Sequence, residues 1–141
     1  MTPDKLRLDE VNRWFALAAR DLHAALLLMR EEPSASVFHS QQCAEKSEKA
    51  LLTFHNVTFR KTHDLTELGK QRAWLAPALT QLLDQAAHLT EYATVFRYTD
   101  APRAPDAAET EAAITTARSL YDTIRELLSP EQTQGTSACN G

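Results

Sequence analysis

The chain has 141 residues, of which 43% are hydrophobic and 24% charged, a composition typical of one globular domain. Only 3 Gly and 6 Pro are present, too few for the many turns of an all-β fold, and the formal net charge of -4 excludes a global attraction to nucleic acid. Two cysteines (Cys43 and Cys139) and no apolar run of signal or membrane-spanning length predict a protein of the reducing cytoplasm, away from membranes.

The first predicted element is a helix over residues 9–31, where apolar side chains recur at steps of four and three. Its stripe consists of Val11, Phe15, Ala18, Leu22, Ala25 and Met29. The stripe is widened beyond one face by Trp14, Leu17, Leu26, Leu27 and Leu28. We therefore expect this helix to contact neighbours on two sides, within a bundle or across a dimer.

A second helix is predicted from Ser34, a possible N-cap, to about Phe54. Its inner side follows the same steps through Val37, Ser40, Ala44, Ser47, Leu51 and Phe54. The middle of that stripe is made of small side chains, which allow another helix to approach closely. This helix is therefore expected to form the centre of a bundle.

After a break in the pattern, Asp64 and Glu67 predict the start of a short helix that Gly69 would end. Pro77 then suits the first position of a longer helix that ends near Tyr98. The predicted stripe of this longer helix is Leu79, Leu82, Ala86, Leu89, Ala93 and Phe96.

Two prolines within residues 99–105 predict a loop, and Asp106 with Glu109 repeats the capping pattern of a helix start. The last helix has the stripe Ala113, Ala117, Leu120, Ile124 and Leu127. Residues 129–141 are polar and aperiodic, as in a disordered tail. The sequence thus predicts an all-α domain over residues 1–128, with four long helices and an additional short one.

The second helix carries a polar run, residues 41–49, that a purely structural core helix does not need. His39, Gln42, Lys46 and Lys49 fall on one line of the helix, and the neighbouring line holds Phe38, Gln41, Glu45, Glu48 and Leu52. The lysine line is suited to hold an anion. Alternatively, Glu45 and Lys49 form a solvated pair worth ~0.3 kcal/mol, and periodicity does not decide between the two.

Four segments in this order resemble the HEPN domain family over roughly residues 10–128. They are Trp14–Leu22 (WFALAARDL), Phe38–Leu52 (FHSQQCAEKSEKALL), Lys61–Leu65 (KTHDL) and Phe96–Asp100 (FRYTD). The resemblance implies an up-and-down helical bundle that dimerises. It also implies a partner, a small nucleotidyltransferase of the MNT type, with which such proteins act as two-component systems.

The resemblance carries over to particular residues. The family's second-helix motif is matched by Gln42, Glu45, Lys46 and Lys49, its connector motif by His63 and Asp64, and the end of its fourth helix by Arg97 and Tyr98. Thr99 stands where family members often have proline. With Lys61, these residues offer charge, an imidazole and an aromatic ring to a nucleotide, a phosphate or the partner. The alternative is structural, with His63 capping a helix and Arg97 pairing with Asp100.

Many HEPN proteins resemble ribonucleases in which an Arg is followed, after four to six residues, by a His that helps to activate the ribose 2'-hydroxyl. Here Arg20 precedes His23, and Arg60 precedes His63, with only two residues between, while eight separate Arg30 from His39. Catalysis is therefore not expected, and no catalytic residue is assigned. A ribonuclease toxin of a toxin–antitoxin system stays open only if an Arg and a His converge from different helices.

No metal or cofactor is predicted. His39 and Cys43 have the i,i+4 spacing of a helical ligand pair, but no second pair completes four ligands, and Cys43 is equally suited to be a small buried residue. Glycines at 69, 135 and 141 cannot form a phosphate-binding loop or a nucleophile elbow. The leading hypothesis is a non-catalytic or weakly catalytic homodimer whose groove on the second helix binds a partner nucleotidyltransferase, a nucleotide or both. The ribonuclease toxin is the second hypothesis, and a structural adaptor is the third.

Overall fold

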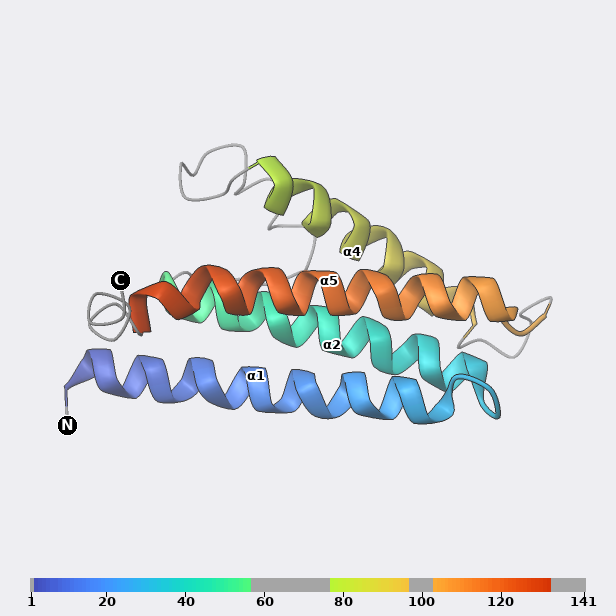
Figure 1. The fold of residues 1–141 in the computed structure, drawn as a ribbon, viewed down its shortest axis with the longest axis horizontal. Helices are drawn as coiled ribbons and strands as arrows, with labels where there is room; N and C mark the ends of the chain where they lie inside the picture. The colour runs from blue at the N-terminus through green and yellow to red at the C-terminus, as the bar shows by residue number, and fades with distance from the viewer. Residues whose placement is uncertain (1, 57–76, 97–102, 133–141) are drawn as a thin grey trace.

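The computed structural model describes residues 2–56, 77–96 and 103–132, with side chains to residue 128. These residues form the helices α1 (Pro3–Leu28), α2 (Pro33–Phe54), α4 (Pro77–Val95) and α5 (Ala107–Gln132), and no strand lies among them. The helices run alternately up and down, with α4 inclined to the other three (Figure 1). The predicted all-α, up-and-down bundle of four helices is confirmed, while the short helix expected at Asp64 lies outside the described residues.

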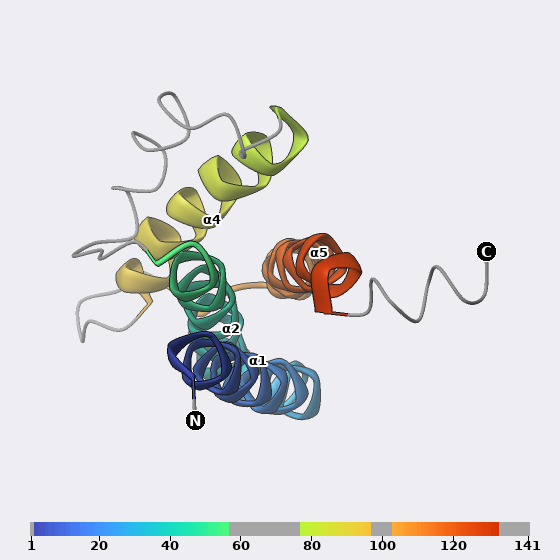
Figure 2. The ribbon, with the colours of Figure 1, turned by 90° about the vertical axis from the view of Figure 1, so that its left-hand side faces the viewer.

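The helix α2 forms the centre of this bundle, as its small side chains predicted. It contacts α1, α4 and α5, whereas α1 and α4 do not touch, and Figure 2 shows α2 between its neighbours. The side chains of Ser40, Ala44 and Ser47 are buried. Close approach is visible at Ser36, whose hydroxyl donates to the carbonyl oxygen of Ala25 on α1 at 2.6 Å.

The main hydrophobic core draws on all four helices. Its largest fully buried members are Leu51, Leu52, Leu83, Leu120, Ile124 and Leu128. A second, smaller cluster joins Cys43 to Ala18 and Ala117. Cys43 is therefore a small buried residue, which was the alternative to a metal ligand. Over the residues that the structure describes, no helix is both long and apolar enough to span a bilayer.

The helices α1 and α2 begin earlier than predicted. The helix α1 begins at Pro3 instead of Asp9, capped by Thr2, whose hydroxyl accepts the amide of Lys5 at 3.1 Å. The helix α2 begins at Pro33, so Ser34 is not its cap. Both shifts have one cause, because proline is favoured at the first helical position and an exposed first turn leaves no trace in the apolar pattern.

Three further expectations were wrong by a few residues. The helix α1 ends at Leu28 and not at Glu31. On α4, Leu83 is fully buried and the predicted Leu82 is only half-buried. On α5, Leu128 is fully buried, while the predicted Leu127 keeps 41% of its surface exposed. A period of 3.6 residues permits either of two adjacent leucines to point inward, so packing against the neighbouring helix decides. The helix α5 also continues to Gln132, four residues beyond the predicted end of the domain at 128.

The predicted cap of α5 is confirmed in atomic detail. Asp106 Oδ1 accepts the amide of Glu109 at 2.7 Å, and Glu109 Oε1 accepts the amide of Asp106 at 2.9 Å, a reciprocal capping box. Arg103 Nη2 also donates to Glu109 Oε2 at 2.9 Å. The hydrogen bond from Arg103 and that from the Asp106 amide lower the pKa of Glu109 to about 2.

Candidate functional site: the polar face of α2

Four of the predicted site residues lie together on one face of α2, on the side not covered by the core. We call Gln42, Glu45, Lys46 and Lys49 the α2 polar face. Each of the four residues is half-buried. Their polar atoms are consequently held by neighbouring side chains, and each contact bears on what the face can bind.

The strongest contact runs from α2 to Asp21 on α1. One carboxylate oxygen of Asp21 accepts a hydrogen bond from Lys46 Nζ, and the other lies 2.8 Å from His39 Nδ1. The Asp21 side chain is only 12% exposed, while those of Lys46 and His39 are 23% and 31% exposed. A buried carboxylate thus binds two basic side chains of α2 and ties the middle of α1 to it.

Lys49 has an acidic and an aromatic neighbour. Its ammonium nitrogen lies 3.9 Å from Glu45 Oε1, the i,i+4 pair expected from the sequence. The same nitrogen stands 4.9 Å from the ring centroid of Trp14 on α1, within the range of a cation–π interaction. The Lys49 charge is therefore partly compensated inside the molecule.

Gln42 continues this chain of contacts across α2 to α4. Its amide nitrogen donates to Glu45 Oε2 at 3.3 Å and to Gln41 Oε1 at 2.8 Å. Gln41 in turn donates to the hydroxyl of Thr90 at 3.3 Å. From Trp14 on α1 to Thr90 on α4, the polar side chains of α2 form one continuous network.

This network changes the chemistry expected of the lysine line. Both lysines already face carboxylates, so their two positive charges are offset by those of Asp21 and Glu45. An anion placed here must displace an internal partner or share a cation with it. The α2 polar face is better described as a fixed, nearly neutral pattern of donors and acceptors than as a cationic cradle.

Four other predicted site residues, Lys61, His63, Arg97 and Tyr98, lie outside the described residues. Conversely, sequence reasoning missed Asp21, Trp14, Gln41 and Thr90 as partners of the polar face. A signal was present for Asp21, because it lies three residues after Ala18 and four before Ala25, within the buried stripe of α1. A carboxylate in such a stripe requires a partner on the helix that covers it.

Two titratable groups on α2 are buried behind this face. Glu48 is 2% exposed, and its Oε1 has no hydrogen-bond partner among the described residues. Burial, followed by the nearby charge of Glu45, raises the pKa of Glu48 well above 4.5. Burial also raises the pKa of the Cys43 thiol to about 12, so the thiol stays protonated and unreactive at neutral pH.

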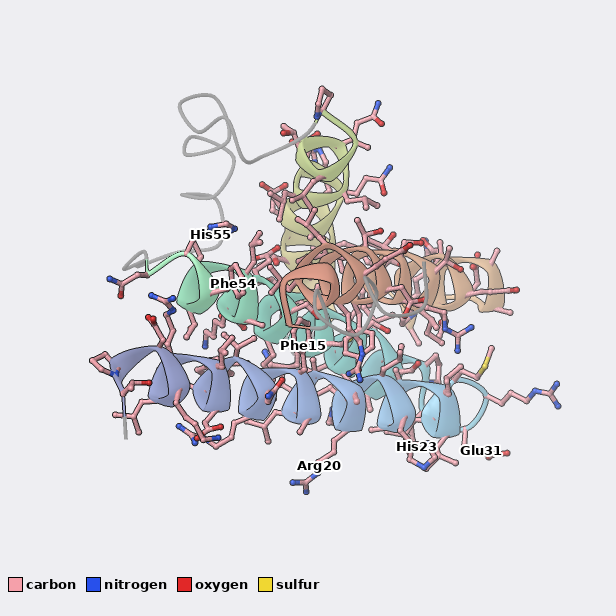
Figure 3. All side chains as sticks on the ribbon, turned by 60° about the vertical axis from the view of Figure 1, so that its left-hand side comes forward. Phe15, Arg20, His23, Glu31, Phe54 and His55 are labelled. Atoms are coloured by element: carbon pink, nitrogen blue, oxygen red, sulfur yellow. The ribbon has the colours of Figure 1, made fainter. Side chains whose placement is uncertain are left out.

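The described residues hold no group of three side chains placed to bind a metal ion. His39, half of the possible ligand pair, instead faces Asp21. The arginine and histidine closest in the described sequence, Arg20 and His23, extend from the outer side of α1, away from the other helices (Figure 3). That geometry leaves them far from the α2 polar face.

These features define a class: a helical bundle whose central helix carries a fixed polar face. The sequence matches the profile of the HEPN domain over residues 11–127. The match covers most of the chain, which therefore belongs to the HEPN domain family. No curated protein and no solved structure gives a significant match.

Proposed function

We propose that this HEPN protein is a non-catalytic, cytoplasmic binding module that forms a homodimer and acts with a nucleotidyltransferase of the MNT type. The partner, a nucleotide or both bind at the α2 polar face. The observation that carries the proposal is the network from Trp14 to Thr90, which fixes the polar side chains before any ligand arrives. Such preorganisation lowers the entropic cost of binding. Because the lysines are already paired, the geometry favours a protein partner over a free anion.

The homodimer is supported by the apolar surface of α1. Six large hydrophobic side chains of the described residues are exposed, and four of them, Leu6, Leu17, Leu26 and Leu27, belong to this helix. Leu27 keeps 68% of its surface exposed. Among the described helices, α1 contacts only α2 and α5, and neither of them covers its outer side. A second copy, offering the same Leu17 and Leu27, would bury both side chains by a two-fold contact.

Light scattering after size-exclusion chromatography tests the dimer. We expect a mass of twice 15.8 kDa at micromolar concentration for the wild type. Leu17→Asp and Leu27→Asp are expected to give monomers, because a charge in an apolar interface must be desolvated. Leu127→Asp, on α5 and of similar exposure to Leu17, is the matched control and should remain dimeric. A monomeric wild type would contradict the interface.

Co-purification tests the partner. If the neighbouring open reading frame encodes an MNT-type nucleotidyltransferase, it should co-elute with the wild type from an affinity column. Lys46→Glu and Lys49→Glu should weaken its binding by about tenfold or more, because each reversal places a carboxylate against Asp21 or Glu45 and destroys the donor pattern of the face. Arg118→Glu reverses an exposed charge on α5 and should have no effect. Equal retention by all variants would exclude the α2 polar face as the docking surface.

A ribonuclease is the second candidate, and one observation favours it. His39 Nδ1 lies 2.8 Å from Asp21, an arrangement that orients an imidazole and leaves its Nε2 available as a general base. Incubation of the purified protein with total RNA distinguishes the candidates. If the protein cleaves RNA, and His39→Ala, His63→Ala or Arg97→Ala abolishes the cleavage, the protein would be a ribonuclease toxin and not a non-catalytic binding module. If neither RNA nor nucleotide nor partner raised the melting temperature, a structural adaptor would be the better description.

A further inference from the structure

A cavity of about 550 Å³ lies where the first turns of α1 meet the end of α2. Its walls are formed by Pro3, Leu6, Arg7, Glu10 and Arg13 of α1 and by Thr53 and Asn56 at the end of α2. Thr53 follows Lys49 by one helical turn, so the cavity continues the α2 polar face without including any of its four residues. No feature of the HEPN resemblance involves these side chains.

The two arginines of this cavity have unused hydrogen-bonding capacity. Arg7 Nη2 lies 3.2 Å from Asp4, whose carboxylate is 79% exposed, so this ion pair is screened by water and weak. Arg7 Nε is buried and lacks a hydrogen-bond acceptor within the described ranges. Arg13 is exposed, and no described residue forms an ion pair with it. An unmatched buried donor is costly, and an oxygen from a ligand would satisfy it.

The backbone does not set the charge of this cavity. The positive end of α1 and the negative end of α2 meet here, so their dipoles largely cancel. The side chains therefore decide. The walls hold the guanidinium groups of Arg7 and Arg13 and the carboxylate of Glu10, and the exposed carboxylate of Asp4 lies 3.2 Å from Arg7. This contrasts with the α2 polar face, where each lysine is matched by a carboxylate. The difference is that Arg7 Nε is buried without an acceptor among the described residues, whereas both lysine ammonium groups face a carboxylate.

We propose that the cavity binds a mononucleotide, with its phosphate held by Arg7 and Arg13. The planar donor fork of a guanidinium suits a phosphate, and the cavity is larger than a phosphate alone requires. Glu10 accepts hydrogen bonds from the ribose hydroxyls, and Pro3 and Leu6 provide an apolar wall for the base. The proposal does not depend on the α2 polar face, which remains available to a protein partner.

Isothermal titration of the full-length protein with AMP, inorganic phosphate and adenosine tests this proposal. We expect AMP to bind more tightly than either of the other two, because only AMP uses both the arginines and the remaining cavity. Arg7→Gln and Arg13→Gln should each weaken AMP binding by about tenfold or more, the loss of a charge-assisted hydrogen bond. Arg118→Gln is the control for a general change of charge and should leave AMP binding unchanged.

Several outcomes would overturn the proposal. They are the absence of AMP binding at millimolar concentration, adenosine binding equal to that of AMP, and an equal loss of affinity in Arg118→Gln. AMP binding that is lost in Lys46→Gln or Lys49→Gln, but kept in both cavity variants, would place the nucleotide on the α2 polar face. That last result contradicts the cavity while supporting the proposed function, so the two proposals can fail separately. Melting curves without ligand verify that the cavity variants are folded.

Discussion

Replacing Asp21 with alanine is expected to destabilise the protein by about 2–3 kcal/mol. The substitution removes the acceptor of two charge-assisted hydrogen bonds, each worth about 1.5–3 kcal/mol when buried, and leaves Lys46 half-buried without its carboxylate. The sum is discounted because Lys46 and His39 are partly exposed and can turn to water. Asp21→Asn keeps the shape and one acceptor oxygen, so about half of that loss is expected.

Urea unfolding followed by circular dichroism, at one protein concentration, measures this effect. Asp9→Ala is the matched control, because Asp9 pairs with Lys5 on the same helix but in an exposed position, and it should change stability by less than about 0.5 kcal/mol. A double-mutant cycle with Lys46→Met isolates the energy of the Asp21–Lys46 pair. An Asp21→Ala variant as stable as the control would mean that this contact does not hold α1 against α2.

Replacing Glu48 with methionine is expected to stabilise the protein, in contrast to the change at Asp21. At pH 7 the free energy of unfolding should rise by about 1–3 kcal/mol, the usual cost of a buried polar group without a partner. Methionine has a similar shape and no charge to desolvate, and its flexible side chain adapts to the space that Glu48 leaves.

The pH dependence follows from the raised pKa of Glu48. In the folded state this carboxyl retains its proton at a pH where the unfolded chain has lost it. Between pH 4.5 and the raised pKa, the folded state therefore binds more protons, and its stability falls as pH rises. Glu48→Gln, which cannot ionise, should lose this part of the slope.

Unfolding at several values between pH 5 and 8 checks both substitutions. Glu91→Gln, on the exposed side of α4, is the control and should retain the slope of the wild type. If Glu48→Met instead destabilised the protein by more than about 1 kcal/mol, the carboxyl would have a hydrogen-bonded role that outweighs its desolvation, and it would belong to the functional site.

The positions of the helices followed from local chemistry. Each of these signals acts on its own helical turn or face, so its effect can be predicted from the sequence. The signals are the capping pair Asp106 and Glu109, the initial Pro77 and the small residues of α2. The sequence did not predict whether Leu82 or Leu83 is buried, because only the packing of a neighbouring helix distinguishes adjacent leucines. The same applies to Leu127 and Leu128.

For the candidate site, the sequence placed Gln42, Glu45, Lys46 and Lys49 on one helical face, because the helical period is a property of one segment. The residues Asp21 and Trp14 were not connected to that face, since they lie about 25 to 35 positions earlier and only the packing of α1 on α2 brings them within reach. Charge neutralisation is a property of pairs in space. The sequence by itself thus determined which basic residues share a surface. The tertiary structure decided that these lysines are already paired, while Arg7 Nε has no acceptor among the described residues.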